Sequence, residues 1–345
     1  MNGYLMHKDS AVSRIENDII VDDNPYLPLM LKKGADITPW ICSSAVDRHR
    51  TNSRLLKKVI RLTDTSDVST VLKAHAATVT DNYWIKFDGE NIEYKNILLN
   101  DDSLADVALF GTFESISNAK YIHCEYSKSP ELTNIGSFEK CWRLRNNKWY
   151  MYKKESPQER FSEIFIYKLG TFFGYDMAQY EQDGDCVVTE DFTLSKKYDF
   201  ESAASIVGDD EDYTLNYKKL YEISPNIAYD YLKIIFMDTL CMNMDRHTNN
   251  YGVLRNSENG AIEKSAPNFD NNIALISRGY TSTQVLQNDL LITLWRELCE
   301  NIDVDFQYPT LKKDDIARIA YSIEINVDKQ YVVDFVYNRY LALTK

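Results

Sequence analysis

The chain has 345 residues, 44% of them apolar, so it can bury more than one hydrophobic core. Its 39 basic and 52 acidic residues give a net charge of -13, which opposes direct binding to nucleic acid over most of the surface. Six scattered cysteines, five histidines and no long apolar run exclude a disulfide scaffold, a local zinc cluster and a membrane-spanning helix, so we expect a soluble cytoplasmic protein.

Residues 1–115 are predicted to form an accessory α+β unit. Residues Tyr83–Lys86 have a strand pattern, and Ser53–Leu62 has a helical one. Basic residues alternate with apolar ones around this helix. The pattern is typical of an amphipathic helix with a solvated basic face, and an anion-binding arm is the alternative.

Residues 116–192 are predicted to form a small nucleotide-binding lobe, which begins with a candidate phosphate loop. The segment Ser129–Lys140 has one glycine, Gly136, next to the hydroxylated Ser137. It matches neither Gly-x-x-x-x-Gly-Lys-Ser/Thr nor Gly-x-Gly-x-x-Gly, so neither a P-loop NTPase nor a Rossmann site is supported. Its backbone N–H groups can still wrap a phosphate, and an ordinary turn is the alternative.

A strand and a helix after this loop supply the charged pair that a kinase needs. The strand Lys148–Lys154 places Lys153 on one face with two large apolar residues. The following helix, Glu159–Phe172, carries Glu159 and Glu163 one turn apart. Glu163 lies deeper in the helix and is the preferred partner of Lys153, with Glu159 left open. A solvated charged face is the alternative.

The lobe is predicted to end in a hairpin with strands Met177–Glu181 and Cys186–Glu190. The acidic connector at Glu190 falls where a hinge for the adenine ring is expected.

Residues 193–345 are predicted to form a mostly helical lobe. Ser224 and Pro225 are a helix start, and apolar residues then recur at helical spacing to Leu240. Asp238 is the only charge between Ile234 and Met244, so we expect a satisfied buried acid that orients the next loop. Further helices are expected at Leu286–Glu300, Asp314–Ile325 and Lys329–Leu343.

The loop after this helix has the residue types and order of a phosphoryl-transfer site. Asp245 is followed by Asn250 at the spacing of a kinase catalytic loop, in which the Asp takes the hydroxyl proton and the Asn binds magnesium. After the loop we expect a strand and a turn, and the chain then runs back along Ala266–Asp270. Asp270 thereby returns to the loop as a second oxygen ligand for the metal. His247 is expected to donate to phosphate or to brace the loop. A polar turn without catalysis is the alternative.

The segment Asp47–Asn52 repeats the Asp-Arg-His start and the Asn five residues after the Asp. It lies far upstream of every candidate nucleotide lysine and has no Pro-x-Phe-Asp at a comparable distance after it. We interpret it as a chance copy.

The order Asn-x-Asp-Arg-His-x-x-Asn-x-Gly and then Ala-Pro-x-Phe-Asp resembles the HipA-type serine/threonine kinases, especially relatives in bacteria and their mobile elements. Further segments that resemble this family are Leu5–Asp9, Thr80–Lys86, Ser129–Arg143 and Gln158–Glu163. The resemblance implies an α+β, two-lobed protein-kinase-like fold close to that of phosphoinositide kinases, with a small mixed-sheet N-lobe and a mostly helical C-lobe. It also implies the roles of the site residues: Asp245 as catalytic base, Asn250 and Asp270 on magnesium, Lys153 on the nucleotide phosphates, and Gly136, Ser137 and Lys140 in the phosphate loop.

Two departures from the family pattern concern loop geometry and leave the catalytic groups in place. Asn271-Asn272 stands where many relatives have Ser-Gly, and Glu139 stands where a proline is common.

We therefore expect a magnesium-dependent ATP phosphotransferase that acts on a protein serine or threonine. The expected ligands are ATP and Mg²⁺, and the expected partners are a protein substrate and an inhibitor or antitoxin protein. Self-phosphorylation at Thr133 or Ser137 and a toxin–antitoxin role stay open. The alternatives are a catalytically silent nucleotide-binding module, a small-molecule or lipid kinase, and a metal-dependent hydrolase.

Overall fold

The computed structural model describes residues 1–46, 50, 52–59, 66–112, 114–115, 117, 128–136 and 138–344. It consists of two compact units. Unit 1 comprises Met1–Lys154, Val188–Glu201 and Leu254–Ile262, and unit 2 comprises Glu155–Val187, Ser202–Val253 and Glu263–Lys345. The sequence-based division at about 115 and 192 stays a prediction.

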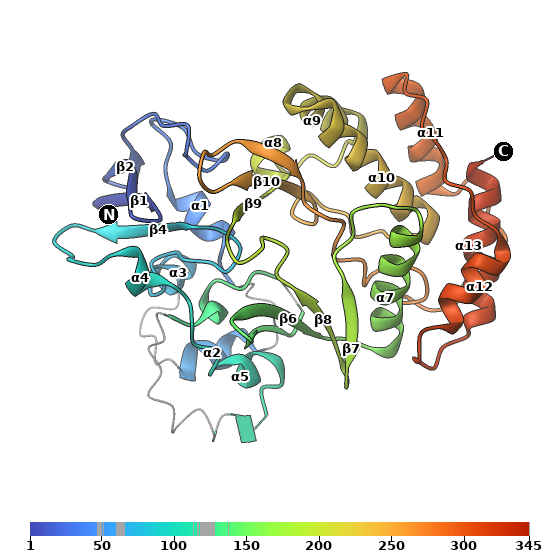
Figure 1. The fold of residues 1–345 in the computed structure, drawn as a ribbon, viewed down its shortest axis with the longest axis horizontal. Helices are drawn as coiled ribbons and strands as arrows, with labels where there is room; N and C mark the ends of the chain where they lie inside the picture. Colours follow the sequence, from blue (N-terminus) through green and yellow to red (C-terminus); the bar gives the residue numbers. More distant parts are fainter. Residues whose placement is uncertain are drawn as a thin grey trace. The chain divides into compact units, whose positions relative to one another are not determined.

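Unit 1 begins with an antiparallel four-stranded sheet in the order β3-β2-β1-β4 (Figure 1). Its strands are β1 (Gly3–His7), β2 (Ser10–Glu16), β3 (Ile19–Ile20) and β4 (Tyr83–Phe87). Alternate residues such as Leu5, Ile15 and Ile85 are fully buried, because strand side chains point to opposite faces in turn. They form one core with residues of α1 (Thr38–Ser43) and α3 (Asp67–Leu72).

The rest of unit 1 contains the predicted lysine strand. The short helices here are α2 (Ser53–Val59), α4 (Tyr94–Ile97), α5 (Ala105–Leu109) and the 3-10 helix η2 (Pro130–Leu132). Strand β6 (Lys148–Lys154) has the predicted bounds and pairs antiparallel with β5 (Lys140–Arg145), in a sheet of order β5-β6-β8-β7.

The predicted hairpin is present with one strand shorter than expected. It is formed by β7 (Tyr180–Asp183) and β8 (Cys186–Glu190). Met177 makes only an isolated parallel bridge with Asn268, so the strand starts three residues later than predicted. A three-stranded sheet follows in the order β11-β10-β9, made by β9 (Tyr198–Ser202), β10 (Gly252–Asn256) and β11 (Ile262–Ser265). The return strand therefore lies at 262–265 and not at 266–270.

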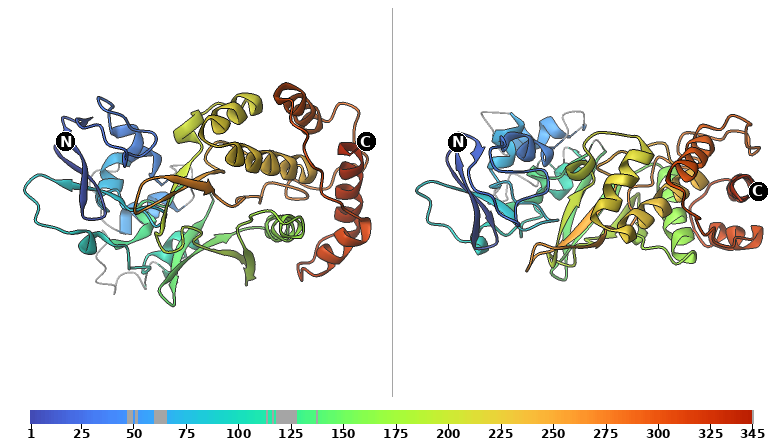
Figure 2. Two further views of the ribbon diagram at one scale, coloured as in Figure 1. Left: turned by 45° about the horizontal axis from the view of Figure 1, so that its top comes forward. Right: turned by 90° about the horizontal axis from the view of Figure 1, so that it is seen from above.

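Unit 2 is mostly helical. Its helices are α7 (Pro157–Phe172), α8 (Ala204–Val207), α9 (Tyr213–Ile223), α10 (Pro225–Cys241), α11 (Leu290–Ile302), α12 (Lys313–Tyr321) and α13 (Lys329–Leu343). Helix α10 runs through the middle of this unit against α7, α9, α11 and α13 (Figure 1), and Figure 2 shows α12 and α13 side by side. Ser224 caps α10 by accepting from the Asn226 N–H, as predicted.

Helix α10 is apolar on most of its surface, and this apolar surface is buried by neighbouring helices on several sides. Phe236 lies with its ring centroid 5.8 Å from that of Trp295 on α11 and 5.2 Å from that of Phe306. The helix therefore fixes the start of the loop that follows it. No helix among the described residues is both long and apolar enough to cross a bilayer.

One prediction concerns a partly buried acid in unit 1. Burial raises the pKa of Asp81 to about 6 from its usual 3.8, although the Thr78 hydroxyl donates to its carboxyl. The folded state then binds this proton more tightly than the unfolded state, so the stabilisation is complete below pH 3.8 and is lost as the pH rises through 6. Urea unfolding at pH 5 and pH 7.5 should show that wild type loses more stability over this interval than Asp81→Asn does. Equal losses would contradict the raised pKa.

Candidate active site

The loop after α10 holds the predicted base and the first predicted metal ligand together. Met242 ends the helix in the left-handed conformation, and the Asn243 side chain accepts from the Asp245 N–H at 3.1 Å. The Asn250 side chain is buried, and its amide Nδ2 donates to the Asp245 carbonyl at 3.0 Å. The amide oxygen of Asn250 is therefore the end of this side chain that can face a cation.

Asp270 is presented by a separate segment of unit 2. It adopts a left-handed backbone conformation with φ 60°, and its N–H donates to the Tyr180 hydroxyl at 3.1 Å. The next residue, Asn271, donates its N–H to the buried Glu163 carboxylate at 2.8 Å. The Asn272 amide donates to Glu155 at 3.0 Å. The two asparagines that depart from the family pattern thus anchor the backbone beside Asp270.

Buried Arg246 joins the loop, the Asp270 segment and α10. Its guanidinium donates to both carboxylate oxygens of Asp238, at 2.8 and 2.9 Å. Its remaining donor contacts go to Asn250 O and Phe269 O, both at 2.7 Å, to Asn268 Oδ1 at 3.1 Å and to Asn271 Oδ1 at 2.6 Å. Asp238 is therefore the satisfied buried acid that the sequence predicted. The sequence reasoning did not find Arg246, although a lone acid in an apolar helix is a signal that a buried cation lies nearby.

The electrostatics of the loop suit a proton acceptor. Partial burial of the carboxylate raises the pKa of Asp245, the negative charge of Asp270 adds to this, and His247 is the main opposing group. His247 Nδ1 accepts from the Asn249 N–H at 3.3 Å. In the neutral ring the proton then sits on Nε2, which makes Nε2 a donor.

The two candidate glutamates of helix α7 have different hydrogen-bond partners. Glu159 belongs to a capping box in which its carboxylate accepts from the Ser156 N–H at 2.7 Å. Glu163 is fully buried and holds the Asn271 backbone. Glu159 is thus used at the start of the helix, and the assignment of Glu163 as the acid that pairs with Lys153 stays a prediction.

The predicted phosphate-binding residues lie in unit 1. Lys153 is buried and stands opposite Lys140 in the β5–β6 ladder. Gly136 has φ 114°, a backbone conformation that residues with a Cβ atom rarely adopt, so glycine suits this position. Ser137 lies outside the described residues. The Glu190 carboxylate accepts from Lys148 at 2.6 Å and from the Tyr150 hydroxyl at 2.9 Å.

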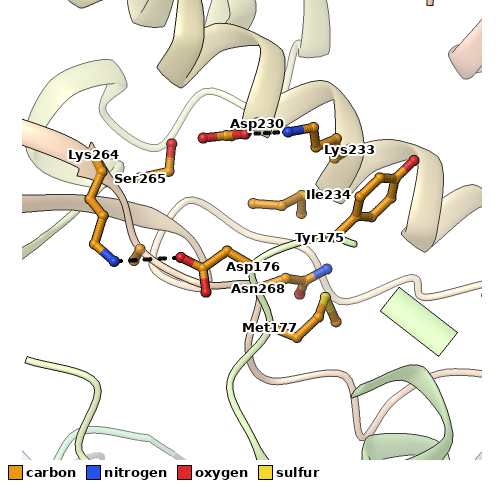
Figure 3. A pocket seen from close by; sticks show the side chains of 10 residues that line it. Tyr175, Asp176, Met177, Asp230, Lys233, Ile234, Lys264, Ser265 and Asn268 are labelled. Atoms are coloured by element: carbon orange, nitrogen blue, oxygen red, sulfur yellow. Dashed lines mark hydrogen bonds and ion pairs between the residues drawn. The ribbon is translucent and has the colours of Figure 1, made fainter. Parts of the chain in front are cut away.

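A cavity of about 90 Å³ lies elsewhere in unit 2 (Figure 3). Ion pairs Asp230–Lys233 and Asp176–Lys264 line it together with Asn268. None of its lining residues belongs to the predicted site. Its connection to the loop is Asn268, which accepts from Arg246.

Comparisons with known proteins bear on the fold. No protein-family model matches the chain, and no curated protein matches its sequence. Among solved structures, HipA of Shewanella oneidensis MR-1, in complex with HipB and its operator DNA, is similar with a TM-score of 0.57 and 11% identity, over 99% of this chain and 96% of that one. The Helicobacter pylori proinflammatory kinase CtkA is similar with a TM-score of 0.43 and 17% identity, over 60% of this chain and 95% of that one. The chain thus has a HipA-like, kinase-like α+β fold, and the predicted fold class is confirmed.

The Asp238–Arg246 pair gives a direct stability prediction. Asp238→Asn leaves a buried guanidinium without its counter-charge, so the free energy of unfolding should fall by about 3–5 kcal/mol. Urea denaturation measures this loss. The matched control is Asp230→Asn on the same helix, where the exposed pair with Lys233 should be worth less than about 1 kcal/mol. Equal effects of the two variants would contradict the role of the pair.

Proposed function

We propose that this protein is a magnesium-dependent ATP phosphotransferase whose acceptor is a serine or threonine of a protein. The observation that carries the proposal is the hydrogen bond from the Asn250 amide to the Asp245 carbonyl, which holds the proposed base and a metal-binding oxygen in one loop. The HipA-like fold supports the same conclusion.

In the proposed reaction, Asp245 accepts the proton of the acceptor hydroxyl. The hydroxyl oxygen forms a bond to the γ-phosphorus, the bond from that phosphorus to the bridging oxygen breaks, and ADP leaves. The raised pKa of Asp245 helps it hold the proton, and the Nε2–H of His247 can donate to a phosphate oxygen.

The donor set suits magnesium, which prefers hard oxygen ligands and retains several waters or phosphate oxygens. The Asp270 carboxylate and the Asn250 amide oxygen would hold the ion, which supplies neutralisation of the phosphate charge. Arg246 keeps both residues in place through the Asn250 and Phe269 carbonyls.

Unit 1 would supply the nucleotide contacts. We assign Lys153 to the phosphates, with Glu163 as its acidic partner, and Gly136, Ser137 and Lys140 to the phosphate loop. Glu190 marks the connector near the adenine ring. We assign this activity to the cytoplasm, where ATP is abundant.

A partner protein is part of the proposal. The HipA structure contains HipB and operator DNA. We propose that any regulatory partner of this chain is likewise an inhibitor or antitoxin, and that it supplies the DNA contact, because the net charge of -13 disfavours one by the chain itself.

The catalytic assignment predicts a clear difference between two variants. Intact-mass spectrometry after incubation with magnesium, ATP and a basic acceptor protein should show added phosphate for wild type. Asp245→Asn should lower the rate by about 10²–10⁴-fold because it removes the general base. Asp47→Asn, at the upstream copy of the motif, is the matched control and should keep wild-type activity.

The alternatives give different outcomes in the same assay. A silent nucleotide-binding module binds ATP and transfers nothing. A small-molecule or lipid kinase consumes ATP and leaves the protein acceptor unmodified. Phosphate transfer by Asp245→Asn at the wild-type rate would overturn the assignment of the base.

Self-phosphorylation should select one of the two hydroxyls in the phosphate loop. The buried Thr133 hydroxyl donates to Ala77 O at 2.8 Å, so it is not available as an acceptor. Phosphopeptide mapping after incubation with ATP should therefore find Ser137 modified and Thr133 unmodified. A phosphate on Ser137 would add a dianion that competes with the phosphates of the nucleotide. Modification of Thr133 would contradict this expectation.

A further inference from the structure

The upstream copy of the motif contributes a buried cation that the proposed reaction does not explain. Of its residues, Arg50 and Asn52 are described, and Asp47, Arg48, His49 and Thr51 lie outside the described residues. Arg50 is 1% exposed. Burying a guanidinium is costly unless its donors are satisfied, so its surroundings show what it holds.

Arg50 donates to three backbone carbonyls of unit 1. Nη1 donates to Asn134 O at 3.4 Å, and Nη2 donates to Ala108 O at 3.1 Å and to Lys140 O. Asn134 lies inside the candidate phosphate loop Ser129–Lys140 and Lys140 is its last residue, with Gly136 between them. One side chain thus contacts the loop on both sides of Gly136.

Glu131, the acid that pairs with Arg50, contacts the same part of the chain. Glu131 is fully buried, and one of its carboxylate oxygens lies 3.8 Å from Arg50 Nη2. It accepts from Asn134 Nδ2 at 3.0 Å and from the Trp142 N–H at 2.7 Å. Two buried, opposite charges therefore hold the backbone at Asn134, Lys140 and Trp142.

Asn52 contacts helix α5. Its side-chain amide donates to Ala108 O at 3.2 Å, the same carbonyl that Arg50 contacts. The described part of the motif copy therefore binds backbone oxygens of α5 and of the loop, unlike Asn250 and its proposed metal.

We propose that Arg50 is a positioning residue for nucleotide binding. It fixes the backbone at Asn134 and at Lys140 so that the Lys140 side chain and the described part of the loop are preorganised for phosphate before ATP arrives. This inference rests on the proposed function, because it requires that the loop binds phosphates. The planar guanidinium of arginine suits this role, because its donors point in fixed directions toward several carbonyls. The ammonium group of lysine is a point charge on a flexible chain.

The test compares Arg50→Met and Arg50→Lys with Arg54→Met, a matched control on the exposed start of α2. Hydrogen exchange of a peptide over 128–142 reports on the loop without nucleotide. Titration with magnesium and ATP gives Kd, and the transfer assay gives kcat and KM for ATP. All variants are compared well below their own Tm.

We expect faster exchange over 128–142 and an ATP Kd raised by about 10- to 100-fold in Arg50→Met, since misplaced phosphate contacts are costly. Arg50→Lys should show a smaller increase, and Arg54→Met should match wild type. Because the loop acts in nucleotide binding, KM for ATP should rise more than kcat falls.

Two results would overturn the inference. One is an Arg50→Met variant with wild-type exchange and wild-type Kd. The other is a variant that has only a lower Tm, with Kd unchanged below it, which is the behaviour of a purely structural residue. If wild type itself binds no ATP, the proposed function fails, and the exchange measurement still shows whether Arg50 holds the loop.

Discussion

The Arg246–Asp238 ion pair is the interaction on which the rest of the candidate site depends. Both charges are buried, and the arginine also binds carbonyl or amide oxygens at Asn250, Asn268, Phe269 and Asn271. A single guanidinium therefore ties the end of α10 to two segments that carry the proposed base and the proposed metal ligands. Its donors are satisfied by protein oxygens, so the desolvation cost of the charge is offset and the loop has one favoured shape.

Buried arginines that pair with an acid and donate to backbone carbonyls occur in the described residues of both units, and two of them lie at the candidate site. Arg246 and Asp238 hold the proposed catalytic loop in unit 2, and Arg50 and Glu131 hold the candidate phosphate loop in unit 1. In both, a buried acid lies beside a buried arginine that also donates to backbone carbonyls. Preorganisation of this kind suits phosphoryl transfer, in which the protein positions groups and stabilises charge more than it forms bonds.

Local patterns predicted some element bounds and missed others, since α11 begins four residues after the expected Leu286. Strand β6 and helix α13 have the expected bounds because period and end signals agree there. The Met177 strand start was wrong because pairing with Asn268 is a single bridge, which no local pattern shows. The partners of Arg246 and Arg50 were beyond sequence reasoning, since the contacts join segments distant in the chain. Among Lys153, Glu163 and Asp245, only the order along the sequence was predictable, and their joint role stays a proposal.

The most direct test of the central claim is label transfer from ATP carrying radioactive phosphorus at either the γ or the α position, with magnesium and a protein acceptor. The account predicts that the γ label appears on the acceptor protein and that the α label does not. Transfer of the α label would mean nucleotidyl transfer, and the absence of both labels from protein would mean that the chain is not a protein kinase.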